Sequence, residues 1–346
     1  MSTSDTVTQY QLLAKNGAFA RASVPRPVPG PTEVSFRTRA VALNPADWKQ
    51  RAWGFAIETW PAVLGLEAAG VVEAVGEQVT AVQVGDEVFG SVGFGGKAAA
   101  FQEVVTVDVT RVGRKPKGLS FEDAVSLPLG FGTAASAVVK GLQIPLRTLL
   151  PPADSTPRAT PLRSVLVLGG SSAVGAAAIQ ILRIAQPELT IFATSSAQHH
   201  ARLLSLGADK AFDRATAQAD PAEIIAAAPG GEGVDAILDA VGAGGEQLAV
   251  FGALRKGGPG LYVQVFTGKD LVVPEGVEHV VASTRFLWAL PGGGEVLTLL
   301  AGLVDEGRYA LPVEVEVVGT GFKAIPGGLD RLQAGLVSGR KLVVSI

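Results

Sequence analysis

Cysteine is absent from this sequence of 346 residues, and histidine occurs only three times, as His199, His200 and His279. Without cysteine the chain can form no disulfide, no thiolate nucleophile and no cysteine-bound zinc site. Three histidines are also too few for a histidine-rich metal centre. We therefore expect a chemistry that needs no metal ion.

The sequence also lacks an excess of charge of either sign and a long apolar run. Its 29 basic and 32 acidic residues give a net charge of −3, which argues against nucleic-acid binding, because that needs clustered Lys and Arg. No apolar run reaches membrane-spanning length, and the N-terminal stretch has no signal-peptide core. We expect a cytoplasmic protein with no membrane or nucleic-acid partner, long enough for two domains.

The most informative motif is SVLVLGGSSAVGAAAIQILR at residues 164–183. A short apolar strand meets two glycines and two serines, and an alanine-rich helix follows. The first amides of that helix have no partner within it, and the helix dipole is positive there, so the turn suits a phosphate group. Gly169 and Gly170 allow the backbone to turn closely, and Gly175 allows the helix to lie tight on the sheet. The motif predicts a nucleotide site, although Gly-rich turns without the full GxGxxG also occur as plain structure.

Two strand patterns divide the chain. Residues 1–130 show short strands rich in Val, Phe and Thr between Gly/Pro turns, which is typical of a compact β-barrel. These strands are expected at 33–43, 68–76, 86–93 and 101–107. A helical pattern follows at 121–142, and the proline-rich segment 143–163 is predicted to be an exposed loop.

From residue 164 onward strands and helices alternate, which predicts βαβ units and a doubly wound parallel sheet. The expected strands lie at 165–168, 190–194, 210–213, 234–242, 260–266 and 280–284, and the expected helices at 173–185, 200–207, 223–228 and 246–254. The tail returns to β character at 311–318 and 341–346, around a helix at 329–336, and is expected to fold back onto the N-terminal domain.

The end of the second strand in this alternating part discriminates between the two nicotinamide dinucleotides. An NAD site places Asp or Glu there, about 20 residues beyond the turn, to bind the ribose hydroxyls. Here the strand ends in SSAQHHAR, residues 195–202, and no carboxylate follows until Asp209. Hydroxyls, imidazoles and a guanidinium suit a 2′-phosphate, which a carboxylate would repel. This favours NADPH over NADH, although Ser195 and Ser196 could also cap the next helix.

The order of motifs resembles that of the zinc-independent medium-chain dehydrogenase/reductase superfamily, and the match covers nearly the whole chain. The matching pieces are ALNPADWK at 42–49, LGLEAAGVVEAVG at 64–76, VGDEVFG at 84–90, the glycine turn, LGAD at 206–209, LDAVG at 238–242 and GRKLVVSI at 339–346. The proline-rich stretch, GGSSAVG, LVDEGR at 303–308 and the ending SGRKLVVSI are most similar to the fungal trans-acting enoyl reductases and toxin-cluster oxidoreductases, the group of the lovastatin enoyl reductase. The resemblance implies an α/β fold with a GroES-like β-barrel domain, residues 1–130 and 311–346. It also implies a Rossmann domain, residues 131–310, with NADPH and substrate in the cleft between the two.

The same resemblance implies site residues by position. Asp47, Trp48 and Lys49 would lie beside the nicotinamide half of the cofactor, and Val265 and Phe266 would contact the nicotinamide amide through their backbone. The turn residues Gly170, Ser171, Ser172 and Ala173, followed by Val174 and Gly175, would hold the pyrophosphate. Ser196, Ala197, Gln198, His199 and Arg214 would hold the adenosine phosphate, and Arg340 and Lys341 would reach in from the tail. The substrate would be bordered by Phe131, Gly132, Thr133, Ser136, Ala282, Ser283, Thr284, Arg285 and Phe286.

Two departures from relatives narrow the chemistry. Leu66 stands where zinc-dependent relatives carry the histidine of a GHE motif, so polarisation of an alcohol by zinc is excluded. Mitochondrial-type enoyl reductases carry a tyrosine about a dozen residues after the start of their NPxD motif, where this chain has Phe55 or Ala56. The usual proton donor is therefore missing, and water is the alternative.

The remaining chemistry is hydride transfer from NADPH to an activated carbon–carbon double bond, with stabilisation of the enolate that forms. Candidate stabilising groups are the Lys49 ammonium, the Thr133 hydroxyl and a backbone amide, whereas Asn44 and Asp47 could act by fixing the geometry of a loop. Three functions remain open: an enoyl-thioester reductase, on a free or carrier-bound substrate and with a synthase partner; a reductase of quinones or free enones; and a non-catalytic NADPH-binding partner protein. Both a monomer and a homodimer are compatible with the sequence.

Overall fold

The computed structural model describes residues 5–150, 153, 161–268 and 271–346, which form two compact units. Unit 1 contains the chain up to Leu129, together with Leu297–Gly307 and Glu314–Ile346, and unit 2 contains Gly130–Val296 and Arg308–Val313. Helix α9 (Val296–Asp305) lies almost wholly in unit 1, whereas the sequence places it in the nucleotide-binding domain. A reason is its packing on β8, where a Cβ on Gly113 would come within 3.0 Å of the Leu297 side chain.

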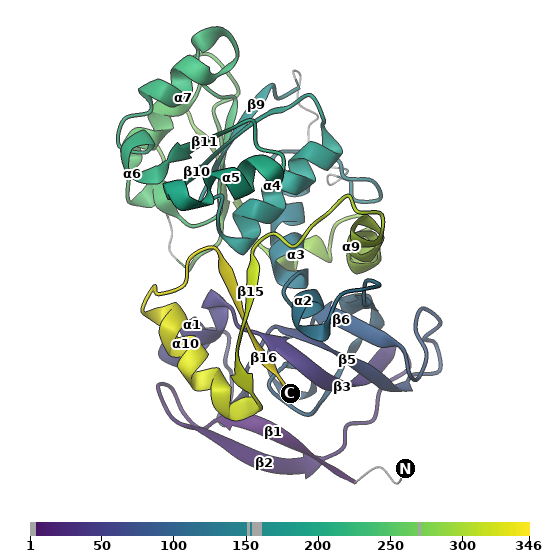
Figure 1. Cartoon of the computed structure of the whole chain (residues 1–346). Coiled ribbons are helices and arrows are strands. Elements are labelled where there is room, and N and C mark those ends of the chain that lie inside the picture. The colour runs from purple at the N-terminus through teal and green to yellow at the C-terminus, as the bar shows by residue number, and fades with distance from the viewer. Residues whose placement is uncertain (1–4, 151–152, 154–160, 269–270) are drawn as a thin grey trace. The chain divides into compact units, whose positions relative to one another are not determined.

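Unit 1 is built on a seven-stranded sheet in the order β15-β16-β3-β5-β6-β8, with β7 paired to β3. These strands are β3 (Glu33–Ala42), β5 (Glu67–Val75), β6 (Glu87–Ser91), β7 (Val104–Asp108), β8 (Val112–Arg114), β15 (Glu314–Thr320) and β16 (Arg340–Ser345). A three-stranded sheet holds β1 (Thr6–Leu12), β2 (Phe19–Pro25) and β4 (Ala62–Val63). Strand β16, near the end of the chain, pairs antiparallel with β3, near its beginning (Figure 1).

The core of unit 1 is formed by apolar side chains of both sheets and of α10 (Ile325–Gln333), including Leu12, Phe36 and Leu329. Helix α1 (Pro45–Trp53) packs on α10. The sequence indicates only a turn at Asn44-Pro45, but proline is well tolerated in the first helical turn, so the same dipeptide also begins this helix.

Unit 2 contains a six-stranded parallel sheet in the order β11-β10-β9-β12-β13-β14. Its strands are β9 (Ser164–Leu168), β10 (Thr190–Ser195), β11 (Lys210–Asp213), β12 (Ala236–Asp239), β13 (Leu261–Val265) and β14 (Glu278–Ala282). The α-helices of this unit are α3 (Pro128–Ser136, from its third residue on), α4 (Ala173–Ala185), α5 (His200–Ser205), α6 (Arg214–Ala217), α7 (Ala222–Ala227) and α8 (Thr284–Leu287). The chain order reverses between β9 and β12, and this confirms the predicted doubly wound sheet.

Two predicted helices differ in the structure. The segment 246–254 forms only the 3₁₀-helix η7 (Leu248–Ala253), because the glycine-rich chain before it approaches the sheet closely: a Cβ on Gly244 would lie 2.6 Å from the Tyr262 hydroxyl. The pattern at 121–142 is divided into α2 (Phe121–Val125), α3 and a π-helical turn at Ala137–Gly141. The first break precedes Pro128, which lacks the N–H that would continue the helix.

The predicted loop 143–163 lies partly outside the described residues. Its described residues contain only turns and one isolated bridge between Leu146 and Leu149. Within the part of the chain that the structure describes, no helix is both long enough and apolar enough to cross a bilayer.

Candidate functional site

The turn after β9 has the geometry of an anion cradle. Gly169 adopts a φ of +70°, and the Ser172 hydroxyl accepts a hydrogen bond from the Gly175 N–H at 3.0 Å, which caps α4. A Cβ on Gly175 would come within 2.3 Å of the Gly169 carbonyl oxygen, so only glycine fits there. Residues 171–174 are half-buried, and the helix N-terminus they form therefore remains open to a ligand.

The residues expected to bind the adenosine phosphate lie at the carboxyl edge of the same sheet. Strands β10 and β11 run parallel with Ser195 beside Asp213, so Ser196 and Arg214 follow at neighbouring strand ends. Ala197, Gln198 and Arg214 are exposed, and Ser196 and His199 are half-buried. The only carboxylate within these two strand ends, that of Asp213, accepts the Ala215 N–H at 2.9 Å and caps α6.

Asp239 at the end of β12 organises the adjacent loop, a role that the sequence analysis missed. Its carboxylate accepts hydrogen bonds from the N–H groups of Val241 (3.0 Å), Gly242 (2.7 Å) and Gly244 (2.8 Å) and from the Tyr262 hydroxyl (2.6 Å). Burial, together with this carboxylate, raises the pKa of Tyr262 far above its usual value, so the phenol stays a donor. The motif LDAVG contained the signal, because an aspartate buried at a strand end needs several donors.

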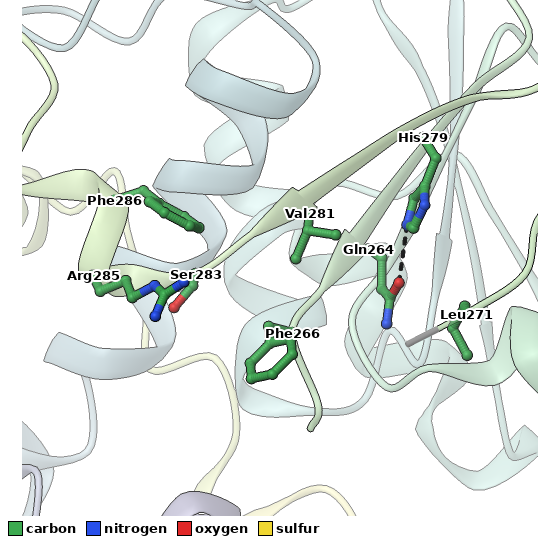
Figure 2. Close-up of a pocket in the computed structure, with 8 residues that line it drawn as sticks. All are labelled: Gln264, Phe266, Leu271, His279, Val281, Ser283, Arg285 and Phe286. Carbon is green, nitrogen blue, oxygen red and sulfur yellow. Dashed lines mark hydrogen bonds between the residues drawn. The ribbon is translucent and has the colours of Figure 1, made fainter. Parts of the chain in front are cut away.

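Unit 2 also contains an open pocket of about 410 Å³ beside β13 and β14 (Figure 2). Four residues predicted from the sequence contribute to it: Phe266, Ser283, Arg285 and Phe286. Its other lining residues, which the sequence did not indicate, are Gln264, Leu271, His279 and Val281. Arg285, Ser283 and Phe286 gather at one end, and a His279–Gln264 hydrogen bond of 2.9 Å lies at the other.

The remaining predicted substrate residues do not line this pocket. Phe131 and Ser136 are fully buried, and the Phe131 ring packs edge-to-face on Tyr309. The hydroxyls of Thr133 and Thr284 hydrogen-bond to each other, and Gly132 lies against Thr284 and Leu287. Ala282 is buried, and its carbonyl accepts the Phe266 N–H at 2.9 Å. The Phe266 N–H, one of the backbone groups predicted to contact the nicotinamide amide, therefore already has a partner within the protein.

In unit 1 the predicted cofactor residues are divided between two environments. The Lys49 ammonium lies 5.6 Å from the Trp48 ring and 5.8 Å from the Trp53 ring; Lys49 and Trp48 are half-buried, and Trp53 is exposed. Arg340 is exposed and pairs with two glutamates, and Lys341 is buried, where it contacts Glu67 and Asn44. Both tail residues expected to reach the cofactor therefore have protein partners.

Asp47 is fully buried, and the charge of Lys341 acts on it. One carboxylate oxygen accepts the Asn44 N–H at 2.7 Å, and the other, Oδ1, has no hydrogen-bond partner among the described residues. Burial raises the pKa of Asp47 to about 7, against the lowering effect of the Asn44 N–H and the Lys341 charge. A buried acceptor without a donor is unfavourable unless a ligand supplies one.

No cluster of three or more His, Asp or Glu side chains suited to a metal ion occurs within the described ranges. The arrangement in unit 2 is compatible with a dinucleotide, since an open helix N-terminus, an end of β10 without a carboxylate and a pocket of mixed polar and apolar lining belong to one sheet.

Comparison with known proteins supports this interpretation. Residues 30–117 match the family model of the alcohol dehydrogenase GroES-like domain, and residues 173–282 match that of the zinc-binding dehydrogenases. The trans-enoyl reductase tndF of Aspergillus flavipes is 32% identical, over 93% of this chain and 94% of its own. The enoyl reductase component lovC of the lovastatin nonaketide synthase of Aspergillus terreus is 33% identical, over 94% and 92%. The solved structure of the CurK enoyl reductase is similar with a TM-score of 0.75 at 28% identity, over 99% of both chains.

Proposed function

The chain belongs to the medium-chain dehydrogenase/reductase superfamily, where fungal trans-enoyl reductases are among its relatives, and from this premise we propose that it reduces an activated carbon–carbon double bond with NADPH. The proposed substrate is an α,β-unsaturated thioester that a separate polyketide synthase supplies on its carrier domain. The names of the relatives tndF and lovC support this substrate class. The pocket beside β13 and β14, with Phe266, Val281 and Phe286 in its lining, offers apolar surface for an acyl chain.

The observation that carries the choice of NADPH is the end of β10. Ser196 and His199 follow this strand where an NAD-binding site would have a carboxylate, and the exposed Arg214 follows the neighbouring strand. An Arg–phosphate contact is charge-assisted and can be bidentate, so Arg214 would favour the 2′-phosphate.

The chain's own residues have three tasks in the proposed reaction. Bound NADPH supplies a hydride for the β-carbon of the double bond. The amides of residues 171–174 would hold the pyrophosphate, and the unpartnered Asp47 Oδ1 would accept a hydroxyl of the nicotinamide ribose. The electron pair of the double bond moves onto the thioester oxygen, where the Lys49 ammonium would stabilise the enolate. A proton from water then completes the α-carbon.

The cofactor assignment is tested by binding and by steady-state rates with NADPH and NADH. We expect Arg214→Gln to weaken NADPH binding about tenfold and to leave NADH binding unchanged, because a single charge-assisted contact is lost. Lys210→Gln is the matched control, since Lys210 is an exposed cation at the opposite end of β11. A wild-type preference for NADH would contradict the proposal.

The substrate assignment is tested with crotonyl thioesters against small quinones and free enones. Reduction of the thioester, with Lys49→Met lowering kcat more than it raises KM, supports the enoyl reductase. Activity on quinones alone would identify a quinone reductase, the runner-up from the sequence. Absence of NADPH oxidation with every acceptor would favour a non-catalytic binding protein.

A further inference from the structure

Lys341 occupies a position where the sequence suggests a cofactor contact, and its observed partners lie within unit 1. Its Nζ lies 2.6 Å from Glu67 Oε2 and 2.5 Å from Asn44 Oδ1, and its side chain is 7% exposed. Freeing the ammonium to bind a ligand would leave the fully buried Glu67 without a counter-charge, which is strongly unfavourable.

Glu67 joins four segments of the chain. It begins β5, it pairs with Lys341 of β16, and its Oε2 also accepts the Asn44 side-chain amide at 3.0 Å. Its second oxygen, Oε1, accepts the Leu129 N–H at 2.7 Å in the first turn of α3. Each oxygen of this carboxylate therefore has at least one partner, and its negative charge is balanced by one lysine.

Asn44 transmits this arrangement to Asp47. The Asn44 side chain is held by Glu67 and Lys341, while its backbone N–H donates to Asp47 Oδ2 and its carbonyl accepts the Asp47 N–H at 3.0 Å. The orientation of Asp47 is thus fixed from one side by the turn, and Oδ1 remains without a partner among the described residues.

We propose that Lys341 is a positioning residue: by holding Glu67 and Asn44 it fixes the turn that presents Asp47 to the cofactor, and it binds no cofactor atom itself. The inference rests on the proposed function in one respect, namely that Asp47 Oδ1 accepts a hydrogen bond from the bound cofactor.

The proposal predicts that loss of Lys341 and loss of the Glu67 charge change the pKa of Asp47 in opposite directions. The Lys341 charge lowers the pKa of Asp47 and the Glu67 charge raises it, while burial has the largest effect. The other charges on the helix packed against α1 have partners of their own, because Asp330 pairs with Arg51 and Arg331 pairs with Glu316. Removal of Lys341 should therefore raise the pKa of Asp47, and removal of the Glu67 charge should lower it.

The test measures NADPH dissociation constants against pH for the wild type, Lys341→Met, Glu67→Gln and the double variant Glu67→Gln/Lys341→Met. Lys341→Met should weaken binding at neutral pH about tenfold and move the acid limb of binding about one unit upward, whereas Glu67→Gln moves it downward. The double variant has no uncompensated charge, and Gln at position 67 can still accept the Asn44 side-chain amide, so its affinity should return to within about threefold of wild type. Lys97→Met is the matched control: its ion pair with Glu33 is also 2.6 Å long, but Lys97 is 47% exposed, and neither affinity nor limb should change.

A double variant as weak as Lys341→Met would overturn the proposal, since it would mean that Lys341 contacts the cofactor directly. The proposal would also be overturned if the acid limbs of NADPH binding moved in the same direction in Lys341→Met and Glu67→Gln. A cofactor-free arm measures urea unfolding of the same four proteins, where Lys341→Met should be the least stable and the double variant should recover. If the wild type binds no NADPH, the proposed function fails, and this unfolding arm alone decides the inference: no recovery in the double variant overturns it.

Discussion

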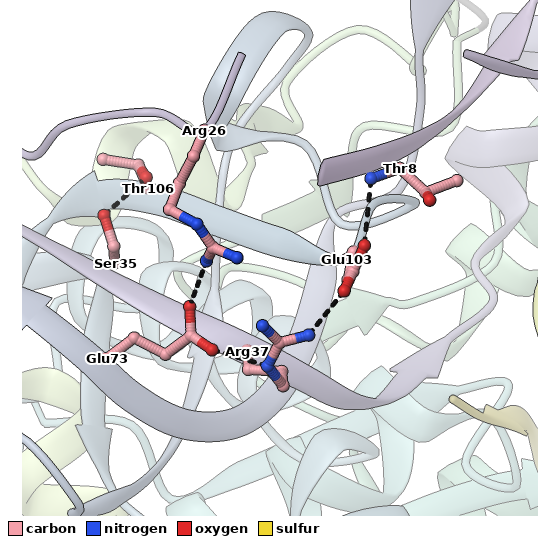
Figure 3. A network of polar contacts seen from close by, with 7 residues as sticks. All are labelled: Thr8, Arg26, Ser35, Arg37, Glu73, Glu103 and Thr106. Atoms are coloured by element: carbon pink, nitrogen blue, oxygen red, sulfur yellow. Dashed lines mark hydrogen bonds and ion pairs between the residues drawn. The ribbon is translucent and has the colours of Figure 1, made fainter. Parts of the chain in front are cut away.

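Two of the networks of charged side chains in unit 1 have nearly equal ion-pair distances and different burial. In the first, Lys341 and Glu67 are 2.6 Å apart and at most 7% exposed. In the second, Arg26 and Arg37 bind Glu73 at 2.6 and 2.5 Å, and Arg37 also binds Glu103 at 2.5 Å (Figure 3). These four side chains are 20–33% exposed.

The surroundings of an ion pair, rather than its distance, decide how much its loss costs. A solvent-screened pair contributes about 0–1 kcal/mol, and loss of one partner can be compensated by water. Loss of one partner in the interior leaves a charge that water cannot reach, at a cost of roughly 3–5 kcal/mol. The surface network can therefore adjust to substitution, whereas the buried one determines the shape of a turn.

The largest effect is expected for Glu67→Ala. It removes the counter-charge of Lys341 and the acceptor of the Leu129 and Asn44 donors, so the free energy of unfolding should fall by about 3–5 kcal/mol. Chemical denaturation gives this value, with Glu73→Ala as the surface counterpart. Equal losses in the two variants would remove the distinction between the networks.

For Asp47→Asn we expect a smaller change in the free energy of unfolding, one that depends on pH. The pKa of Asp47 rises from 3.8 to about 7 on folding, so the folded state binds more protons in that range and the aspartate costs stability as pH rises through it. The stability of Asp47→Asn relative to wild type should therefore increase between about pH 4 and pH 7, by on the order of a few kcal/mol. Unfolding curves at several pH values measure this difference, and a difference independent of pH would contradict it.

The smallest effect is expected for Glu73→Gln in the surface network. The two arginines lose one carboxylate but keep solvent, and Arg37 keeps Glu103, so unfolding should change by about 1 kcal/mol or less. Added salt should reduce the difference further, because it screens exposed charges. A loss that persists in about 1 M salt would show that this network also behaves as a buried one.

Most of the fold could be predicted because its signals are local. The alternation of strands and helices after residue 164 predicts the parallel sheet, and GGSSAVG predicts the turn that caps α4. The predicted helix at 246–254 was wrong, since its apolar spacing says nothing of how closely Gly244 approaches Tyr262. That approach depends on a strand more than a dozen residues further along the chain.

The candidate site was less predictable for the same reason. The expected phosphate-binding residues follow from two strand ends, and the structure brings them to one edge of the sheet. Lys341 and Asn44, by contrast, are 297 residues apart, and only the pairing of β16 with β3 brings them together. A motif search assigns each residue a role by itself and cannot show that the Lys341 ammonium donates a hydrogen bond to the Asn44 side chain.

The pairing of β16 with β3 also sets an order of events during synthesis. Unit 2 and most of unit 1 leave the ribosome before residues 340–345, so the central sheet of unit 1 lacks β16 until those residues have been made. Until then Glu67 has no lysine beside it. Residues 340–345 therefore complete a sheet whose other strands include β3, made about 300 residues earlier, and a product truncated before residue 340 should leave one edge of β3 without its partner strand.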